Sequence, residues 1–243
     1  MQPFRDRRIG WAVITIIAGL LSACAAQQPV ARMQTLPPKP VATTDQQDQP
    51  KGWWAARFYM DWPADTEPSW YMGALIAHRI IAPVLRHYQD EIHLWRFHRR
   101  AAHDESGHRF TFYFYATPQT AEPVLDYIRD NELLDQLTAT GSILRTAYSD
   151  PGINQQPKIE DTSDAKWTPA LQKAWPYFIM GTSQMWLDLI DRRVAERSWD
   201  EIEATLAQLH QLYREVDAEV VNVWQTEGRH AFLLQLNAIF DYE

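Results

Sequence analysis

The chain has 243 residues, of which 46% are hydrophobic and 12% aromatic. This composition is enough to bury a sizeable core and excludes a wholly disordered protein. The formal net charge is -8, with 31 acidic residues against 23 Lys and Arg, which argues against a general nucleic-acid binder. The single Cys excludes an intrachain disulfide framework and a Cys-rich zinc site.

Residues 1–23 have the pattern of a secretory signal. Three arginines lie within the first eight residues and precede an uncharged run over 9–23. That run is too short for a comfortable transmembrane helix, which needs about 20 apolar residues. It leads into Leu21-Ser22-Ala23-Cys24, which resembles the lipobox of bacterial lipoproteins.

The resemblance implies a diacylglycerol thioether on Cys24 and an acylated amino terminus, so that the membrane is a partner of the chain. Ala25 and Ala26 follow the Cys where inner-membrane lipoproteins often carry Asp. The family's sorting rule therefore implies an outer-membrane location facing the periplasm. The alternative is a plain signal peptide, or an uncleaved anchor, with an incidental Cys. We expect residues 24–52, rich in Pro and Gln, to carry the lipidated Cys and a disordered tether.

From Trp53 the chain becomes rich in aromatic residues, and its patterns predict a sheet unit over 53–149. Strands are expected over 53–62, 92–101, 109–116 and 142–149. Helices are expected over 69–88 and 119–137, the first of them kinked or divided by Pro83. The order β-α-β-β-α-β predicts a ferredoxin-like α+β fold, with a four-stranded sheet and both helices on one face.

The remaining residues, 150–243, are expected to form a loop and C-terminal helices packed on the sheet unit. Residues 150–167 are polar and predict the loop. Thr168 and Pro169 then fit a helix cap and a first helical position. Pro176 is expected to start or kink the segment that follows.

A further helix is expected after Ser198, which fits a capping box with Glu201. Apolar residues alternate at spacings of three and four over 199–223, as in a heptad seam. This stripe either mediates dimerisation or packs within the same chain. Gly228 is expected to end the helix, and residues 232–240 to form another amphipathic piece.

The sheet unit and the start of the helical part also carry a family resemblance. It consists of the Trp-rich opening strand, a helix ending in Pro83-Val84-Leu85, the hairpin LWRFHRR…GHRFTFYF and a later helix after an irregular loop. From Trp53 to about Ile190 this layout resembles the C-terminal domain of lantibiotic dehydratases and thiopeptide-type biosynthesis proteins. The family's His-Leu-Arg-Leu-Arg-type strand and its Tyr-Gly-Gly segment have no counterpart here. The resemblance implies a fold and no functional residue.

The hairpin carries the most pointed chemistry in the sequence. Alternation along the strand over 92–101 places three cationic side chains on one face, and residues of the next strand join them across the turn. Arginine forks bind carboxylates and phosphates, and aromatic flanks suit sugar rings or extended peptide. We therefore expect an anionic envelope glycan, lipid headgroup or acidic partner segment to bind Arg96, His98, Arg100, Arg109 and Tyr113. The alternative is that these arginines pair with acids of the helical half and only cover the sheet.

Six of the 8 histidines lie between residues 78 and 108. A metal site at the hairpin tip is conceivable from His103, Asp104, Glu105 and His108, whereas solvated histidines are the simpler interpretation. No Gly-x-Ser-x-Gly elbow, Gly-rich phosphate loop or His-Glu-x-x-His is present.

The sequence therefore predicts a non-catalytic binding or assembly module, lipid-anchored through Cys24. No cofactor, metal or nucleic acid is expected, and the partner is expected to be an envelope protein or an anionic glycan or lipid. The alternative is an envelope hydrolase or a metal-dependent enzyme that uses the His-rich hairpin over 93–108.

Overall fold

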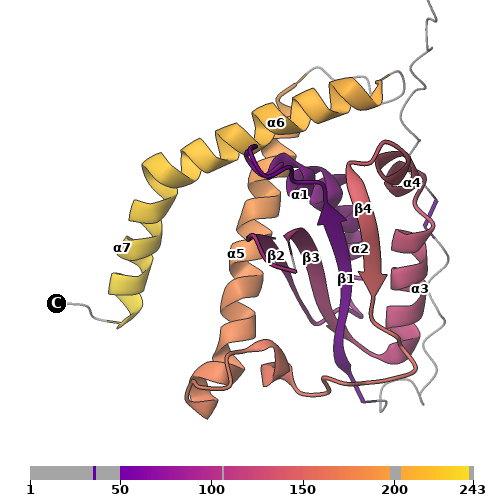
Figure 1. Cartoon of the computed structure of the whole chain (residues 1–243). Coiled ribbons are helices and arrows are strands. Elements are labelled where there is room, and N and C mark those ends of the chain that lie inside the picture. Colours follow the sequence, from indigo (N-terminus) through magenta and orange to yellow (C-terminus); the bar gives the residue numbers. More distant parts are fainter. Residues whose placement is uncertain (1–34, 37–49, 106, 198–203, 241–243) are drawn as a thin grey trace, which may run out of the picture.

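The computed structural model describes residues 35–36, 50–105, 107–197 and 204–240. It consists of a sheet unit and a set of C-terminal helices (Figure 1). The strands are β1 Gly52–Met60, β2 Leu94–Ala101, β3 His108–Ala116 and β4 Ile143–Tyr148. The α-helices are α1 Tyr71–Ile76, α2 Ala82–His87, α3 Pro118–Arg129, α4 Glu132–Ala139, α5 Pro169–Ala195, α6 Leu206–Val223 and α7 Arg229–Phe240. Shorter helical turns are η2 Ala77–Ile81, η3 Ile159–Thr162 and η4 Trp224–Gly228.

The four strands form one antiparallel sheet in the order β2-β3-β1-β4. The register pairs Trp54 with Phe114 and Phe97 with Phe112. The prediction of an α+β chain with a four-stranded sheet followed by helices is confirmed. Among the described helices, none is long and apolar enough to cross a membrane.

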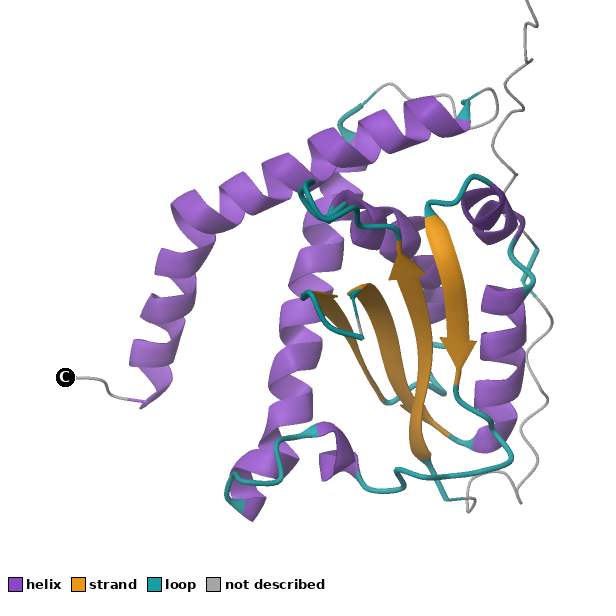
Figure 2. Ribbon diagram, in the orientation of Figure 1, coloured by secondary structure: helices purple, strands orange, loops and turns teal. Residues whose placement is uncertain are grey.

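Alternation along β1 and β3 divides the sheet into two chemically different faces. One face carries large apolar residues that are all buried: Trp54, Ala56, Phe58, Met60, Phe110, Phe112 and Phe114. Helices α1, α2 and α3 lie behind this face in Figure 2. The other face is turned toward the viewer, and no helix of the described chain crosses it. Burial of the apolar face therefore leaves the alternate, polar side chains of the same strands on an open surface.

The helix expected over 69–88 is present as α1, η2 and α2, which follow one another without a break. Pro83 lies at the start of α2 and has no amide hydrogen to donate. The wider π turn of η2 directly precedes it, in the place where a kink was expected.

The helix expected over 119–137 is in fact two helices, α3 and α4, and the single-helix prediction is wrong. Asn131 separates them in an extended conformation, and its side-chain oxygen accepts a hydrogen bond from the amide of Leu133 at 3.1 Å. An Asn N-cap favours a new helix start over continuation of the old one.

The predicted cap of α5 is confirmed, because the Thr168 side chain accepts a hydrogen bond from the amide of Leu171 at 3.4 Å. Pro176, by contrast, does not start a helix but lies inside α5. Its missing amide leaves the carbonyl of Gln172 without a helical donor. The hydroxyl of Ser163 in the preceding loop donates to that carbonyl at 2.7 Å and replaces the lost hydrogen bond.

Helix α6 begins later than expected, after the N-cap residue Thr205, which forms a reciprocal capping box with Gln208. Residues 198–203, including the predicted box of Ser198 and Glu201, lie outside the described residues. The apolar stripe packs within the chain against α1 and α5. Its buried members are Leu209, Tyr213, Val216 and Val220.

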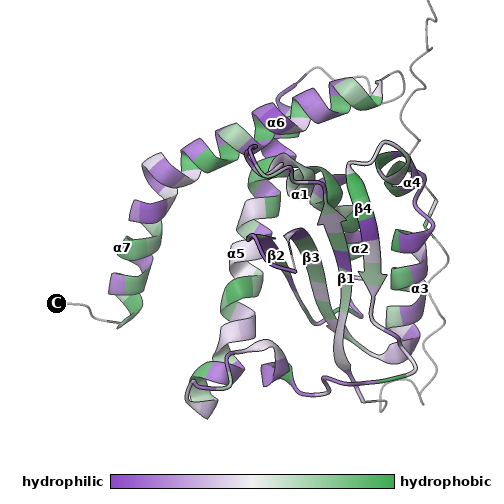
Figure 3. Cartoon of the chain, in the orientation of Figure 1, coloured by the Kyte–Doolittle hydropathy of each residue, from purple (hydrophilic) through white to green (hydrophobic). Residues whose placement is uncertain are grey.

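The prediction that Gly228 ends the helix is wrong. The glycine lies in the π turn η4, and the chain continues directly into α7. A helical glycine costs only about 1 kcal/mol, which continuing hydrogen bonds can offset. No residue of α7 is buried, although the ring of Phe232 lies 5.8 Å from that of Phe178 of α5. Apolar side chains on the rest of α7 are exposed: Leu233, Leu234, Ile239 and Phe240 (Figure 3).

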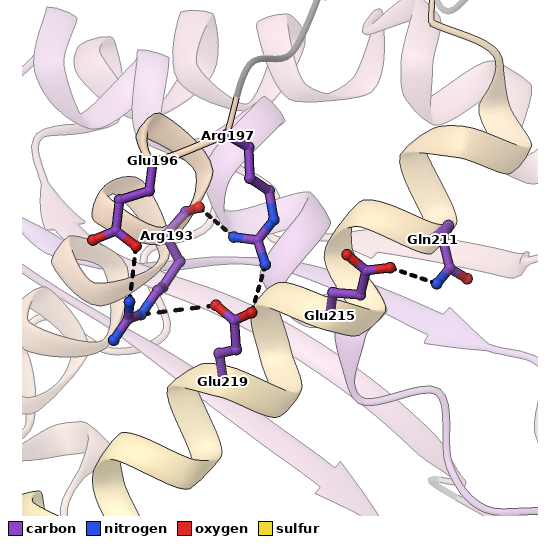
Figure 4. A network of polar contacts seen from close by, with 6 residues as sticks. All are labelled: Arg193, Glu196, Arg197, Gln211, Glu215 and Glu219. Atoms are coloured by element: carbon purple, nitrogen blue, oxygen red, sulfur yellow. Dashed lines mark hydrogen bonds and ion pairs between the residues drawn. The ribbon is translucent and has the colours of Figure 1, made fainter.

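An ion-pair network joins the end of α5 to α6 (Figure 4). Arg197 lies 2.7 Å from Glu219, and Arg193 lies 2.8 Å from Glu196 and 3.9 Å from Glu219. These side chains are partly exposed, so the network orients the two helices more than it stabilises them.

Candidate functional site

The five residues predicted to bind an anion all lie on the open face of the sheet. On β2, Arg96 and Arg100 alternate with the residues that face the helices. The register places Arg96 beside Tyr113 and Arg100 beside Arg109. His98 lies between the two arginines of β2 and is exposed.

The structure adds residues from β1 and β4 that sequence reasoning missed. Arg57 and Tyr59 of β1 pair with Thr111 and Arg109 of β3, and Tyr59 also pairs with Arg145 of β4. The alternation of Arg57 and Tyr59 with buried apolar residues was a usable signal in the sequence. Nothing in the sequence alone placed β1 next to β3. We name the whole surface the cationic face: Arg57, Tyr59, Arg96, His98, Arg100, Arg109, Thr111, Tyr113 and Arg145.

The tyrosine rings of the cationic face are covered by guanidinium groups. The Arg145 guanidinium carbon lies 3.3 Å from the ring centroid of Tyr59, and that of Arg96 lies 4.8 Å from the ring centroid of Tyr113. Arg109 and Arg57 approach the same two rings at 5.8 and 5.9 Å. Such contacts hold the arginines in place without neutralising them, so their charge remains available to a ligand.

Four arginines of the cationic face have no acidic partner in the described part of the chain. Among the described residues, no carboxylate lies within ion-pair distance of Arg57, Arg96, Arg109 or Arg145. Arg100 differs, because it bonds to Asp104 at 2.8 Å. The alternative interpretation, that the predicted hairpin arginines pair with acids of the helical half, holds for none of Arg96, Arg100 and Arg109 among the described residues.

Desolvation and the charges of neighbouring arginines both shift pKa values on the cationic face. Desolvation, and then the charges of Arg96, Arg109 and Arg100, lower the pKa of His98 below its usual value. Desolvation also raises the pKa of Tyr59, but hydrogen bonds from Arg109 and Arg145, and then the charges of these two arginines, outweigh it and lower this pKa overall. In both shifts the charges that contribute are those of arginines of the cationic face.

Two kinds of polar atom at the cationic face lack a hydrogen-bond partner. The hydroxyl of Thr111, a residue with 0% exposure, has none, and neither have the buried Nε atoms of Arg96 and Arg109. Buried polar groups are normally paired, so these three atoms have hydrogen-bonding capacity that the described structure does not use.

The loop after β4 closes one end of the cationic face. The Tyr115 hydroxyl donates to the carbonyl of Pro157 at 2.8 Å, and Trp53 Nε1 donates to that of Ile159 at 2.9 Å. A weaker bond of 3.4 Å joins Arg96 to the carbonyl of Thr162. Away from this loop, His98 and Arg145 are the members of the face that are exposed among the described residues, while Thr111 between the arginines is buried.

The histidines of the hairpin tip are engaged with tryptophans instead of converging on a point. His103 stacks on Trp62 at 4.0 Å, and His108 meets Trp70 edge-on at 5.2 Å. Burial, with the nearby charge of Arg99, lowers the pKa of His108 to about 4. Among the described residues, no group of three or more His, Cys, Asp or Glu is placed to hold a metal ion.

One further chain of polar groups has the order of a catalytic triad. Asp191 of α5 lies 2.9 Å from His78 Nε2, and His78 Nδ1 contacts the hydroxyl of Tyr213. Tyr213 has 0% exposure, so its hydroxyl cannot reach a substrate. These three hydrogen-bonded side chains therefore join η2, α5 and α6 and have a structural role.

Comparison with known proteins adds no family. No family model, curated protein or solved structure matches the chain. The guanidinium forks of the cationic face have the planar donor geometry that matches the oxygens of carboxylates and phosphates.

Proposed function

We propose that this chain is a non-catalytic binding module that captures an anionic ligand on the cationic face. The observation that carries the proposal is the gathering of Arg57, Arg96, Arg109 and Arg145 on one sheet surface, with no acidic partner among the described residues, in a chain of net charge -8. Grouped cations repel one another, and a bound oxyanion removes that repulsion while accepting their hydrogen bonds.

The ligand group is a phosphate or a carboxylate. Guanidinium groups already lie over the rings of Tyr59 and Tyr113, which leaves these rings poorly available for stacking against sugars or bases. The planar donor forks of the arginines instead match the oxygen spacing of carboxylates and phosphates.

We further propose that the module is attached to a membrane through a lipid on Cys24, at the outer membrane and facing the periplasm. The sequence Leu21-Ser22-Ala23-Cys24 supports this proposal. The proposed tether, the Pro- and Gln-rich residues 24–52, would span roughly 30 Å as a flexible coil. The cationic face could then meet an anionic component of the envelope away from the bilayer surface.

The finer fold assignment is also a proposal, namely that the sheet unit is ferredoxin-like. The element order and the strand order β2-β3-β1-β4 support it. The division of the second helix into α3 and α4 is a local departure from that pattern.

Replacing Arg109 and Arg145 together by Gln should weaken binding of tripolyphosphate, a small polyanion, by at least tenfold. Each replacement removes a charged donor from the face, and charge-assisted hydrogen bonds contribute about 1.5–3 kcal/mol. Isothermal titration calorimetry of the full chain measures the affinity. Binding should also raise the pKa of His98, seen by NMR titration, because a bound anion favours the charged imidazolium.

The matched control is Arg192→Gln with Arg229→Gln. It makes the same change in net charge at two exposed arginines outside the sheet. If the control weakened binding as much as the double variant of the cationic face, capture would be a property of net charge and the proposal would fail.

Replacing Cys24 by Ser should move the protein from the membrane fraction to the soluble fraction. The variant lacks the thiol that carries the lipid, and the buried acyl chains of that lipid are what hold the protein at the membrane. Fractionation followed by immunoblotting measures this. Tripolyphosphate affinity of the variant serves as the control for folding. A variant that stayed in the membrane fraction would show that Cys24 is not the anchor.

A further inference from the structure

An apolar groove of about 350 Å³ opens beside the cationic face. It is lined by residues of β2, α5 and the α6–η4 junction, among them Phe97, His98, Met185, Trp186, Val221 and Trp224. A volume of this size lies within the range of small-molecule sites, which are mostly apolar with a few polar groups. His98 lines the groove and is also a member of the cationic face, so the two surfaces meet at this residue on the edge strand β2.

The groove exists because α5 packs along the outer edge of β2. Ser183 Oγ accepts a hydrogen bond from the amide of Phe97 at 3.1 Å, which pairs an otherwise free edge of the sheet. The ring of Trp186 packs against that of Phe97 at 5.5 Å and forms the wall of the groove. Helix α6 crosses nearby, and Val220, Val221 and Trp224 form the other wall.

The groove holds apolar surface in contact with water. Met185 and Val221 at its rim are 41% and 39% exposed. An apolar ligand that covers this surface removes it from water, which lowers the free energy of the complex.

The groove itself supplies no free charge for an anion. Its one arginine, Arg99, is bonded to Asp217 at 2.9 Å and to the carbonyl of Trp70 at 2.6 Å. Four arginines without an acidic partner among the described residues belong to the cationic face: Arg57, Arg96, Arg109 and Arg145. A ligand that satisfies both surfaces therefore has an anionic end for the sheet and an apolar end for the groove.

Building on the proposed function, we propose that the site takes an anionic amphiphile, one molecule at a time. The phosphate or carboxylate binds the cationic face and the hydrocarbon chain lies between α5 and α6. The two helical walls enclose the groove on both sides, which suits a single chain free of the bilayer better than a flat lipid surface.

A series of alkyl phosphates tests this inference, measured by calorimetry on the full chain below the micelle concentrations. Each methylene that enters the groove should tighten binding about three- to fourfold. Octyl phosphate has four more methylenes than butyl phosphate and should therefore bind about 80- to 250-fold tighter when all four enter the groove. Octyl maltoside, which has the same chain and no charge, should bind weakly.

The variant Met185→Glu with Val221→Glu places two charges at the rim of the groove. It should abolish the dependence on chain length and leave tripolyphosphate binding within about twofold. The control, Leu171→Glu with Leu233→Glu, changes exposed apolar residues of α5 and α7 outside the groove and should keep the dependence.

The outcomes separate this inference from the proposed function. If tripolyphosphate binds and butyl and octyl phosphate bind equally, the inference fails while the anion site stands. If no anion binds, the proposed function itself fails. Binding of octyl maltoside as tight as octyl phosphate, or binding of phosphatidylglycerol vesicles without binding of octyl phosphate, would each overturn the inference of a monomeric anionic amphiphile.

Discussion

Replacing Asp217 by Ala is expected to lower the free energy of unfolding by about 3–5 kcal/mol. Asp217 of α6 is 8% exposed and lies 2.9 Å from Arg99 of β2. Burial raises the pKa of Asp217 and lowers that of Arg99, while their mutual attraction opposes both shifts. Without the carboxylate, a largely buried guanidinium keeps its charge and loses its partner. Urea denaturation of the full chain measures the loss.

Two further variants make this expectation specific. Arg99→Met with Asp217→Leu removes both charges and should recover most of the stability, because an apolar pair leaves no charge buried. Asp126→Ala breaks the exposed pair with Arg129 and should cost no more than about 1 kcal/mol. If Asp217→Ala cost as little as Asp126→Ala, the pair would not hold α6 to the sheet.

The Arg99–Asp217 pair also bears on the site. Arg99 points to the helices from the strand whose alternate residues, Arg96, His98 and Arg100, form part of the cationic face. A pair that holds one side of β2 against α6 therefore positions the other side for a ligand. Octyl phosphate affinity should fall in Asp217→Ala more than tripolyphosphate affinity, since the groove depends on the position of α6.

Acidification is expected to destabilise the protein through His108. The pKa of its ring is about 4 in the folded protein, below the usual value of 6.5, because burial disfavours the charged form and Arg99 repels it. The unfolded chain therefore binds the proton first. Stability from the neutral ring is complete above pH 6.5 and is lost as the pH falls toward 4. Between pH 7 and 4.5 the loss is about 2–3 kcal/mol.

The variant His108→Phe isolates this effect from the other titrating groups. Its stability should fall by about 2–3 kcal/mol less than that of the unmodified chain over the same pH range, while the two curves run parallel above pH 7. His108→Asn serves the same purpose if the Phe variant folds poorly. Equal pH dependence in the unmodified chain and both variants would show that the ring titrates normally in the folded protein.

Local patterns in the sequence were sufficient for the strands, for several helix starts and for part of the site. Alternation along the hairpin placed Arg96, His98 and Arg100 on one face, and Thr168 marked the start of α5. Both depend on neighbouring residues along the backbone, where side-chain direction repeats every two residues in a strand and caps lie within one turn of a helix.

Local propensity was misleading where a helix-breaking residue lies inside a longer helical segment. Pro176 and Gly228 are helix breakers by propensity, yet α5 runs through the first and α6 continues into α7 through the second. In the first case the missing hydrogen bond is restored by Ser163, from a loop that folds back onto the helix. Propensity measures only the helix itself and cannot include such a donor.

Only the tertiary structure decided what the cationic face contains. Strand order brings Arg57, Tyr59 and Arg145 beside the hairpin, and no local pattern determines which strands become neighbours. The same holds for the groove, whose walls come from β2, α5 and α6. These arrangements follow from burying the apolar face of the whole sheet under helices, a global requirement that leaves the arginines together on the side that remains open.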